Sequence, residues 1–224
     1  MRRLGAFVKL DWFTIKPYCT WKNTLLFLVM AAVVSQFGQS ISMMVGVVMM
    51  YASMYVSYPF AVGEKSNLDA LYATLALSRR EVVAGRYLFA IGLDVGAAAL
   101  ALAAGPMVRG ITGEDVGIVQ LAATIAIVFA VFSLVQAVQL PLYFKLGYAK
   151  AKFVAVMPYV LISVGGLAAA TVMKDRNVVA LAANVFVWIE ANPVWFAGAC
   201  MTVWAVIMAA SCRLAAAFYQ KRAF

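Results

Sequence analysis

The chain has 224 residues, of which 66% are hydrophobic and 12% are charged, and its mean hydropathy is +0.93. A soluble protein of this size needs a charged surface, and so few charged residues cannot cover one, which excludes a soluble globular protein. The longest charge-free stretches reach about 20 residues or more, the length at which a helix crosses a bilayer. The sequence therefore predicts an all-α integral membrane protein with a single transmembrane domain over residues 1–224.

The first 22 residues are too short to cross a bilayer, but they combine aromatic side chains with basic ones. Leu4, Phe7 and Ile15 share one helical face, which Asp11 interrupts. We expect residues 1–22 to form an amphipathic helix that lies in the membrane interface. The alternative is a frayed basic N-terminus.

Apolar runs of spanning length follow along the rest of the chain. We predict six transmembrane helices, at residues 23–39, 42–62, 87–108, 116–144, 153–173 and 193–214.

Basic residues mark alternate connections between these spans. Of the 18 basic residues, all but Arg109, Lys174 and Arg176 fall on the side that holds both termini. The positive-inside rule places that side in the cytoplasm. The net charge of +9 then faces anionic membrane lipid and cytosolic partners. Nucleic acid is not an expected partner, because the basic residues flank spans and form no stripe with interleaved aromatic residues.

The predicted cytoplasmic segment 63–86 has the pattern of a short amphipathic helix. Apolar residues recur in it at i, i+3, i+4 and i+7: Leu68, Leu71, Tyr72 and Leu75. Ser78 and Glu81 form a capping box, so a second helix should begin at Arg79 and run into the third span. Since a simple tether would be rich in glycine, serine or polar residues, the apolar stripe indicates either a helix that docks on a partner or another helix on lipid.

On the opposite side, the connection 174–192 is long and unusually apolar. It is too short and too broken for a span, and too apolar for a solvated loop. We expect a re-entrant or interfacial hairpin on the outer side, anchored by Trp188 and Trp195.

Missing residue types exclude several kinds of chemistry. The sequence has no histidine, which excludes His-based metal sites and Ser-His catalysis. It also has no P-loop motif for ATP. Asp94 is the one carboxylate well inside a predicted span, whereas an intramembrane aspartyl mechanism needs a pair. We therefore expect that the chain is not itself an enzyme. We also expect it to have no catalytic, cofactor-binding or metal-binding residues.

Asp94 itself has two interpretations. An acid inside the membrane is a candidate for a proton relay or for contact with a cationic substrate. It can also be structural, in a wet vestibule or bonded to a neighbouring Ser or Tyr, while Gly92 and Gly96 let another helix approach closely. In the fourth span, polar residues recur every three positions and either line a polar seam or bond across helices: Ser133, Gln136 and Gln139.

The span 42–62 is rich in methionine and tyrosine. Flexible thioethers and amphipathic rings suit a surface that accepts varied amphipathic cargo. The alternative is ordinary helix packing. With Asp94 from the third span, the candidate residues of a substrate path are Met43, Met50, Tyr51, Met54, Tyr55 and Asp94.

This combination of spans, interfacial helix, cytoplasmic helix and apolar outer hairpin resembles ABC-2-type exporter permeases. Residues 60–89 (FAVGEKSNLDALYATLALSRREVVAGRYLF) are similar to the small permeases of bacterial peptide-export and immunity transporters, such as the phenol-soluble-modulin exporter family. An acidic-basic opening, Glu64-Lys65, leads there to a short helix. An LPxSR-like stretch follows at 75–79, in which Ala76 stands where a proline is usual.

The resemblance implies a permease that binds no cofactor and is energised by two copies of a separate cytosolic ABC ATPase, which hold ATP and magnesium. Two permeases, identical or different, would form a path for an amphipathic peptide, lipid or drug out of a bacterial cell. The chain would be a multi-pass protein of the bacterial cytoplasmic membrane, with both termini cytoplasmic. The implied ATPase-coupling residues are Glu64, Lys65, Leu68, Leu71, Tyr72, Leu75, Ser78, Arg79 and Arg80.

Two other function classes stay open. A proton-coupled secondary transporter would use Asp94 and no nucleotide, and a non-transporting membrane scaffold would use neither.

Overall fold

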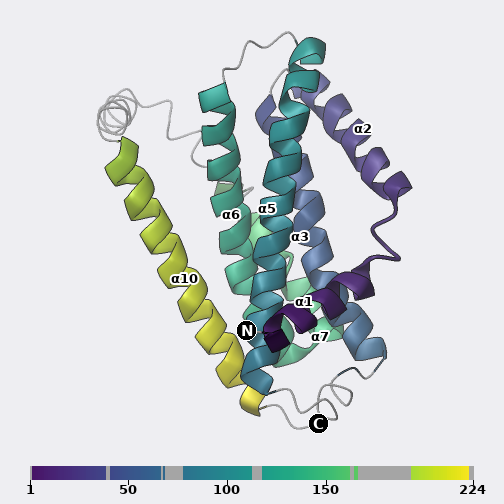
Figure 1. Cartoon of the computed structure of the whole chain (residues 1–224), viewed down its shortest axis with the longest axis vertical. Coiled ribbons are helices and arrows are strands. Elements are labelled where there is room, and N and C mark those ends of the chain that lie inside the picture. The colour runs from purple at the N-terminus through teal and green to yellow at the C-terminus, as the bar shows by residue number, and fades with distance from the viewer. Residues whose placement is uncertain are drawn as a thin grey trace.

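Every element in the part of the chain that the structure describes is a helix. The computed structural model describes residues 2–38, 41–66, 68, 78–112, 118–161, 164–165 and 193–221 (Figure 1). The helices are α1 (Arg2–Ile15), α2 (Trp21–Gly38), α3 (Ile41–Lys65), α5 (Arg79–Thr112), α6 (Ile118–Leu146), α7 (Tyr148–Val154) and α10 (Pro193–Lys221). The predicted all-α fold is confirmed for these residues.

Four of these helices are long and apolar enough to cross a membrane. They contain the spans Met43–Lys65, Arg79–Gly105, Leu121–Leu146 and Gly198–Lys221. They correspond to the predicted second, third, fourth and sixth spans, and they make the chain a multi-pass membrane protein.

The other two predicted spans are not shown by the structure. The apolar part of α2, Trp21–Val34, is shorter and takes the place of the predicted first span. Of the predicted fifth span, 153–173, the structure describes residues 153–161 and 164–165, whereas the predicted hairpin 174–192 lies wholly outside the described residues.

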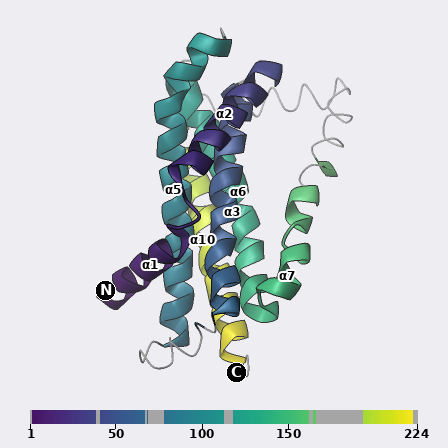
Figure 2. The ribbon, with the colours of Figure 1, turned by 90° about the vertical axis from the view of Figure 1, so that its right-hand side faces the viewer.

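The long helices stand side by side, with α10 along one flank of the bundle and α2 along the other (Figure 1). Helix α1 crosses α5 and α3 near one end of the bundle, and α7 lies at the same end (Figure 2). We call this the α1 end. Helix α3 ends here, α5 begins here, and α6 and α10 end here, so the predicted basic connections described by the structure gather on one side.

Two apolar clusters fill the bundle. The α1-end cluster comprises Phe7, Val56, Val82, Val83, Tyr87, Ala90, Ala137, Leu140, Phe144, Met208, Ala215 and Tyr219. The far cluster comprises Ala31, Met44, Val45, Val48, Met49, Ala52, Ala97, Ala101, Leu121 and Ile125. Small residues in the far cluster let helices approach closely. At Gly105, a Cβ atom would collide with the Leu121 side chain.

Helix α1 forms over Arg2–Ile15, so the frayed alternative is wrong for these residues. Phe7, Asp11 and Ile15 recur every four residues and are all buried. The Phe7 ring packs where Gly85 of α5 has no side chain, because a Cβ there would overlap the ring. Asp11 therefore lies on the buried face of α1, between the two apolar residues.

Candidate functional site

The first helical turn of α5 lies in the segment 63–86, which we predicted to bind an ATPase. The Ser78 backbone N–H donates to Glu81 Oε2 at 2.8 Å, and the Glu81 backbone N–H donates to Ser78 Oγ at 3.2 Å. This reciprocal pair is the predicted capping box, and it satisfies two backbone donors that a helix start leaves without partners. The predicted start of the helix at Arg79 is confirmed.

Arg79 ties the start of α5 to the end of α10. Its Nη1 donates to the carbonyl oxygens of Tyr219 at 3.1 Å and Gln220 at 2.7 Å. The last carbonyls of a helix lack intrahelical partners and carry partial negative charge, so a guanidinium is well matched to them. Of the two adjacent arginines predicted to contact the ATPase, Arg79 thus contacts α10, while Arg80 is exposed.

At the other end of the segment, Glu64 links α3 to α7. Its Oε2 accepts a hydrogen bond from the Ala149 backbone N–H at 3.1 Å. Gly147 makes the sharp turn between α6 and α7 at a φ of 76°, which glycine adopts without steric cost. Lys65, the last residue of α3, is exposed.

The apolar stripe of the segment is described at one position only. Leu68 is half-buried and packs against the α1-end cluster of its own chain. Leu71, Tyr72 and Leu75 lie outside the described residues. The structure thus shows how both ends of the segment are fixed, and the stripe between them stays a prediction.

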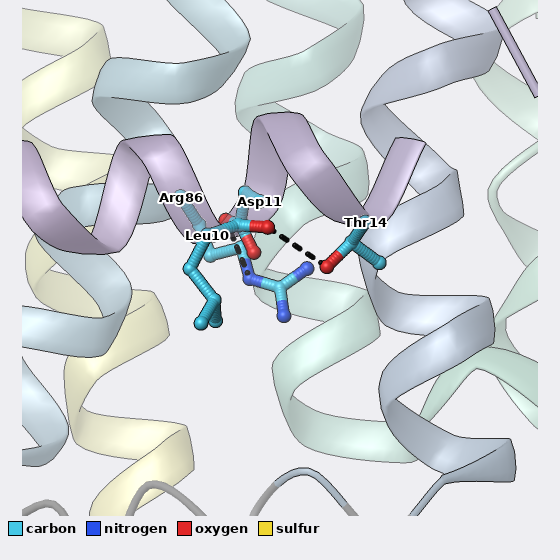
Figure 3. A network of polar contacts seen from close by, with 4 residues as sticks. All are labelled: Leu10, Asp11, Thr14 and Arg86. Atoms are coloured by element: carbon cyan, nitrogen blue, oxygen red, sulfur yellow. Dashed lines mark hydrogen bonds and ion pairs between the residues drawn. The ribbon is translucent and has the colours of Figure 1, made fainter. Parts of the chain in front are cut away.

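Beside these helix ends, Arg86 of α5 pairs with Asp11 of α1 (Figure 3). The Arg86 Nε and Asp11 Oδ2 atoms are 3.2 Å apart, and both side chains are buried. The guanidinium also lies 4.6 Å from the centre of the Phe60 ring, a cation–π contact with α3. Burial raises the Asp11 pKa to about 6, although the Arg86 charge acts to lower it.

The sequence interpretation missed this pair. It treated Asp11 as a break in an apolar face and Arg86 as one of many basic residues flanking a span. A usable signal was present, because a lone acid on a helix face that packs against a membrane protein needs a cation or a proton. A pocket opens beside the pair, among the ends of α3, α5, α6 and α10, and Arg86, Phe60 and Glu64 help to line it.

The candidate residues of the substrate path do not converge on one surface. Met43, Met50 and Met54 are 47%, 53% and 46% exposed on the outside of α3. Tyr51 and Tyr55 instead bond to each other, with their hydroxyl oxygens 2.8 Å apart. Tyr55 is buried, and its hydroxyl donates at 3.1 Å to the backbone carbonyl of the residue at position 18.

Asp94 lies deep inside the bundle. It is fully buried, and its Oδ1 accepts a hydrogen bond from Gln136 Nε2 at 2.7 Å. A Cβ atom added at Gly92 or Gly96 would meet no described atom within 4 Å, so no described helix packs tightly against their predicted close-approach face. The observed hydrogen-bond partner of Asp94 is thus an amide of α6, whereas the structural interpretation named a water-filled vestibule or a neighbouring Ser or Tyr.

The polar residues of α6 bond across helices, as one of the two interpretations predicted. Ser133 Oγ accepts from the Trp204 indole N–H of α10 at 2.7 Å. Gln139 Nε2 donates to the Ala155 carbonyl oxygen at 2.7 Å. Among the described residues, no group of three or more Cys, Asp or Glu side chains is placed to hold a metal ion.

Comparison with known proteins shows the family. The model of the ABC-2 family transporter proteins matches residues 7–220. No curated protein and no solved structure matches the chain. The matched residues include α5 with its capping box and, except for Lys221, the four described helices that are long and apolar enough to span a membrane. The chain belongs to the ABC-2 family of transporter proteins and is a membrane permease component, of a kind that works with a partner ATPase subunit.

Proposed function

We propose that this permease exports an amphipathic substrate from a bacterial cell and is driven by a separate ATPase that docks on residues 66–78. The observation that carries the proposal is the way both ends of this segment are anchored. Glu64 bonds to α7 at one end, and Arg79 bonds to α10 at the other. A force applied to the segment therefore reaches four helices at once, through α3 and α5 directly and through α7 and α10 by hydrogen bonds.

The docking contact is the apolar stripe of the segment. Leu71 and Leu75 enter a cleft on the ATPase, and Arg80 forms ion pairs at the rim. Buried apolar anchors dominate such interfaces, whereas exposed rim charges contribute little. Two ATPase subunits serve two permeases, which are identical or different chains, and the reading frame beside this gene encodes the soluble P-loop protein.

Leu71→Asp tests the docking contact. Burying a Leu at an interface contributes about 1–3 kcal/mol, and an unpaired buried charge adds a further penalty. We expect the ATPase to be lost from purified complex while the permease stays in the membrane. Ala73→Asp adds the same charge on the opposite face of the predicted helix and should leave the complex intact. Equal co-purification with both variants would contradict the coupling role.

The orientation follows from the same proposal. Residues 66–78 and both termini face the cytosol of a bacterium, across its cytoplasmic membrane. In a variant with the native cysteines replaced, a cysteine introduced at position 70 should react with an impermeant thiol reagent only after the cells are opened. Reaction in intact cells would overturn this topology.

The cargo is an amphipathic molecule, with a membrane-active peptide as the first choice and a lipid or hydrophobic drug as the others. Within the described spans, the buried charged side chains are Arg86 and Asp94, which are too few to replace the hydration shell of an ion or a sugar phosphate. The exposed thioethers of Met43, Met50 and Met54 form the one methionine-rich face of α3, and flexible thioethers adapt to varied apolar ligands.

Replacing these three methionines with Ala tests the cargo surface. We expect weaker stimulation of the ATPase by amphipathic peptides, with assembly unchanged. The matched control replaces three exposed methionines on other helices or segments: Met30, Met157 and Met201. Equal stimulation in both triple variants would place the cargo path elsewhere. Tyr51 and Tyr55 are left unchanged, because their hydroxyl groups bond to each other and their loss would alter contacts within α3.

The rival function classes make different predictions. Transport that survives ATP depletion and is lost in Asp94→Asn would identify a proton-coupled transporter. No transport under any condition would identify a scaffold. ATP-dependent transport agrees with the proposed function alone.

A further inference from the structure

Asp94 and Gln136 form a pair in the interior of the bundle that has more hydrogen-bond acceptors than donors. Gln136 Nε2 donates to Asp94 Oδ1 at 2.7 Å. The two remaining oxygens of the pair, Asp94 Oδ2 and Gln136 Oε1, are buried and have no hydrogen-bond partner among the described residues. An ionised Asp94 and an amide oxygen can only accept hydrogen bonds, so neither atom can satisfy the other.

No positive charge compensates Asp94 in the part of the chain that the structure describes. The ion pair found there joins Arg86, two helical turns earlier on α5, to Asp11 of α1. A buried carboxylate with one amide donor and no cation is costly, because burial removes the water that stabilises its charge. An ionised Asp94 therefore does not fit the arrangement around it.

A single proton removes the imbalance. Placed on Asp94 Oδ2, it makes that atom a donor and makes the side chain neutral. Gln136 Oε1 belongs to the same amide whose nitrogen already contacts Oδ1, and it is the acceptor without a partner. A neutral Asp94 has the donor that Gln136 Oε1 lacks, so its chemistry permits a second hydrogen bond in the opposite direction.

We propose that Asp94 and Gln136 form a proton-binding site inside the membrane, in which a neutral Asp94 donates its proton to the side-chain oxygen of Gln136. The proposal does not depend on the export role. The site joins α5 to α6 without a buried charge. Any rearrangement that separates the two helices at this level leaves the acid without its acceptor, so proton release accompanies separation when water reaches Asp94.

Tyrosines on the elements that pack around Asp94 have hydrogen-bond partners of their own, so the proton stays assigned to Asp94. The hydroxyl oxygen of Tyr159, which follows α7, is 2.6 Å from Ser53 Oγ of α3. On α3, Tyr55 bonds to Tyr51, away from this pair. On α5 and α10, Tyr87 bonds to Ser211. No Lys or Arg of the described helices forms an ion pair with Asp94.

Infrared difference spectroscopy of the full-length permease in lipid bilayers tests the proposal. We expect the spectrum of wild type minus Asp94→Asn, taken at neutral pH, to contain the carbonyl band of a protonated carboxylic acid. The band should shift down in heavy water, because its proton exchanges. Asn has nearly the same shape as a neutral Asp, so this variant should fold, and an unchanged thermal unfolding midpoint would verify that it does.

Two further variants assign the band. Gln136→Leu removes the acceptor and should shift the band to higher frequency, as for an acid that donates no hydrogen bond. Asp11→Asn should leave the band in place, which separates Asp94 from the other buried carboxyl. Carboxylate bands at neutral pH in place of the acid band would overturn the proposal. So would a spectrum that changes with sodium or potassium concentration, since it would indicate a bound cation.

Discussion

The two ends of the helix bundle are held together by different forces. At the α1 end, charged and polar side chains tie one helix to another: Arg86 to Asp11, Arg79 to the last carbonyls of α10, and Glu64 to α7. In the far cluster, apolar residues of α2, α3, α5 and α6 pack without a described ion pair. Among the described residues, directional contacts fix the α1 end, and apolar packing fixes the far half.

This difference matters for transmitting motion. Directional polar contacts in a low-dielectric interior have few satisfactory geometries, because a broken one leaves a buried polar group without a partner. Apolar contacts between small residues have no such directional requirement. The α1 end is therefore suited to move as one body when a partner acts on residues 66–78, and the far half is suited to repack in response.

The largest expected effect comes from removing one charge of the buried pair. Arg86→Ala leaves Asp11 buried without a cation, and breaking such a pair costs about 3–5 kcal/mol. Thermal unfolding of the purified permease should show a large loss of stability. Arg80→Ala removes an exposed arginine of the same helix and should change the stability little. Adding Asp11→Asn to Arg86→Ala should recover part of the loss, and no recovery would contradict the pairing.

The second effect is a pH dependence of stability that Asp11 controls. Its pKa rises from an ordinary value of 3.8 to about 6 in the folded protein. The folded state thus binds the proton more tightly than the unfolded state, so this contribution is fully present below pH 3.8 and is lost as the pH rises through about 6. The full swing is at most roughly 3 kcal/mol. The free energy of unfolding, measured between pH 3.8 and about 6, should fall with rising pH in the wild type. The Asp11→Asn variant should not show this dependence.

The third effect is steric, and it distinguishes the α1 end of the bundle from the far half. Gly85→Ala places a methyl group against the Phe7 ring and should displace α1, at a cost of about 1–3 kcal/mol for overpacking. Hydrogen exchange should show faster exchange of α1 amides. Gly92→Ala on the same helix meets open space and serves as the control. Gly105→Ala collides with Leu121 in the far half, and it should lower stability without exposing α1.

The smallest effect concerns the link between α5 and α10. Arg79→Gln removes the charge-assisted hydrogen bonds to the last carbonyls of α10, which contribute on the order of 1 kcal/mol at this partly exposed site. The end of α10 should fray, which hydrogen exchange of its last turn would detect. Arg80→Gln is the matched control. Equal protection of the α10 amides from exchange in the two variants would show that Arg79 does not hold the end of α10.

Local features of the fold were predictable from the sequence, and long-range pairs were not. The start of α5 followed from Ser78 and Glu81, because a capping box involves residues three positions apart. Helix α1 followed from its periodicity in the same way. The pairing of Asp11 with Arg86 joins residues far apart in the chain, and nothing in either local pattern says which basic residue the acid will meet.

The candidate site shows the same limit. Asp94 and Gln136 were each singled out for their position within a span, but not as partners, since helix rotation decides which faces meet. The methionines and tyrosines of α3 looked like one surface in the sequence. They divide because residues three or four apart share a helix face, whereas neighbouring positions such as Met50 and Tyr51 point about 100° apart.

Site-specific photocrosslinking from position 71, in cells that also make a partner P-loop ATPase, tests most directly whether residues 66–78 couple the permease to an ATPase. We predict a crosslink to the ATPase from this position and none from position 195, where Trp195 is exposed at the far end of α10. Crosslinks from position 71 to lipid or to the permease itself, without the ATPase, would contradict the claim that this segment couples the permease to its energy source.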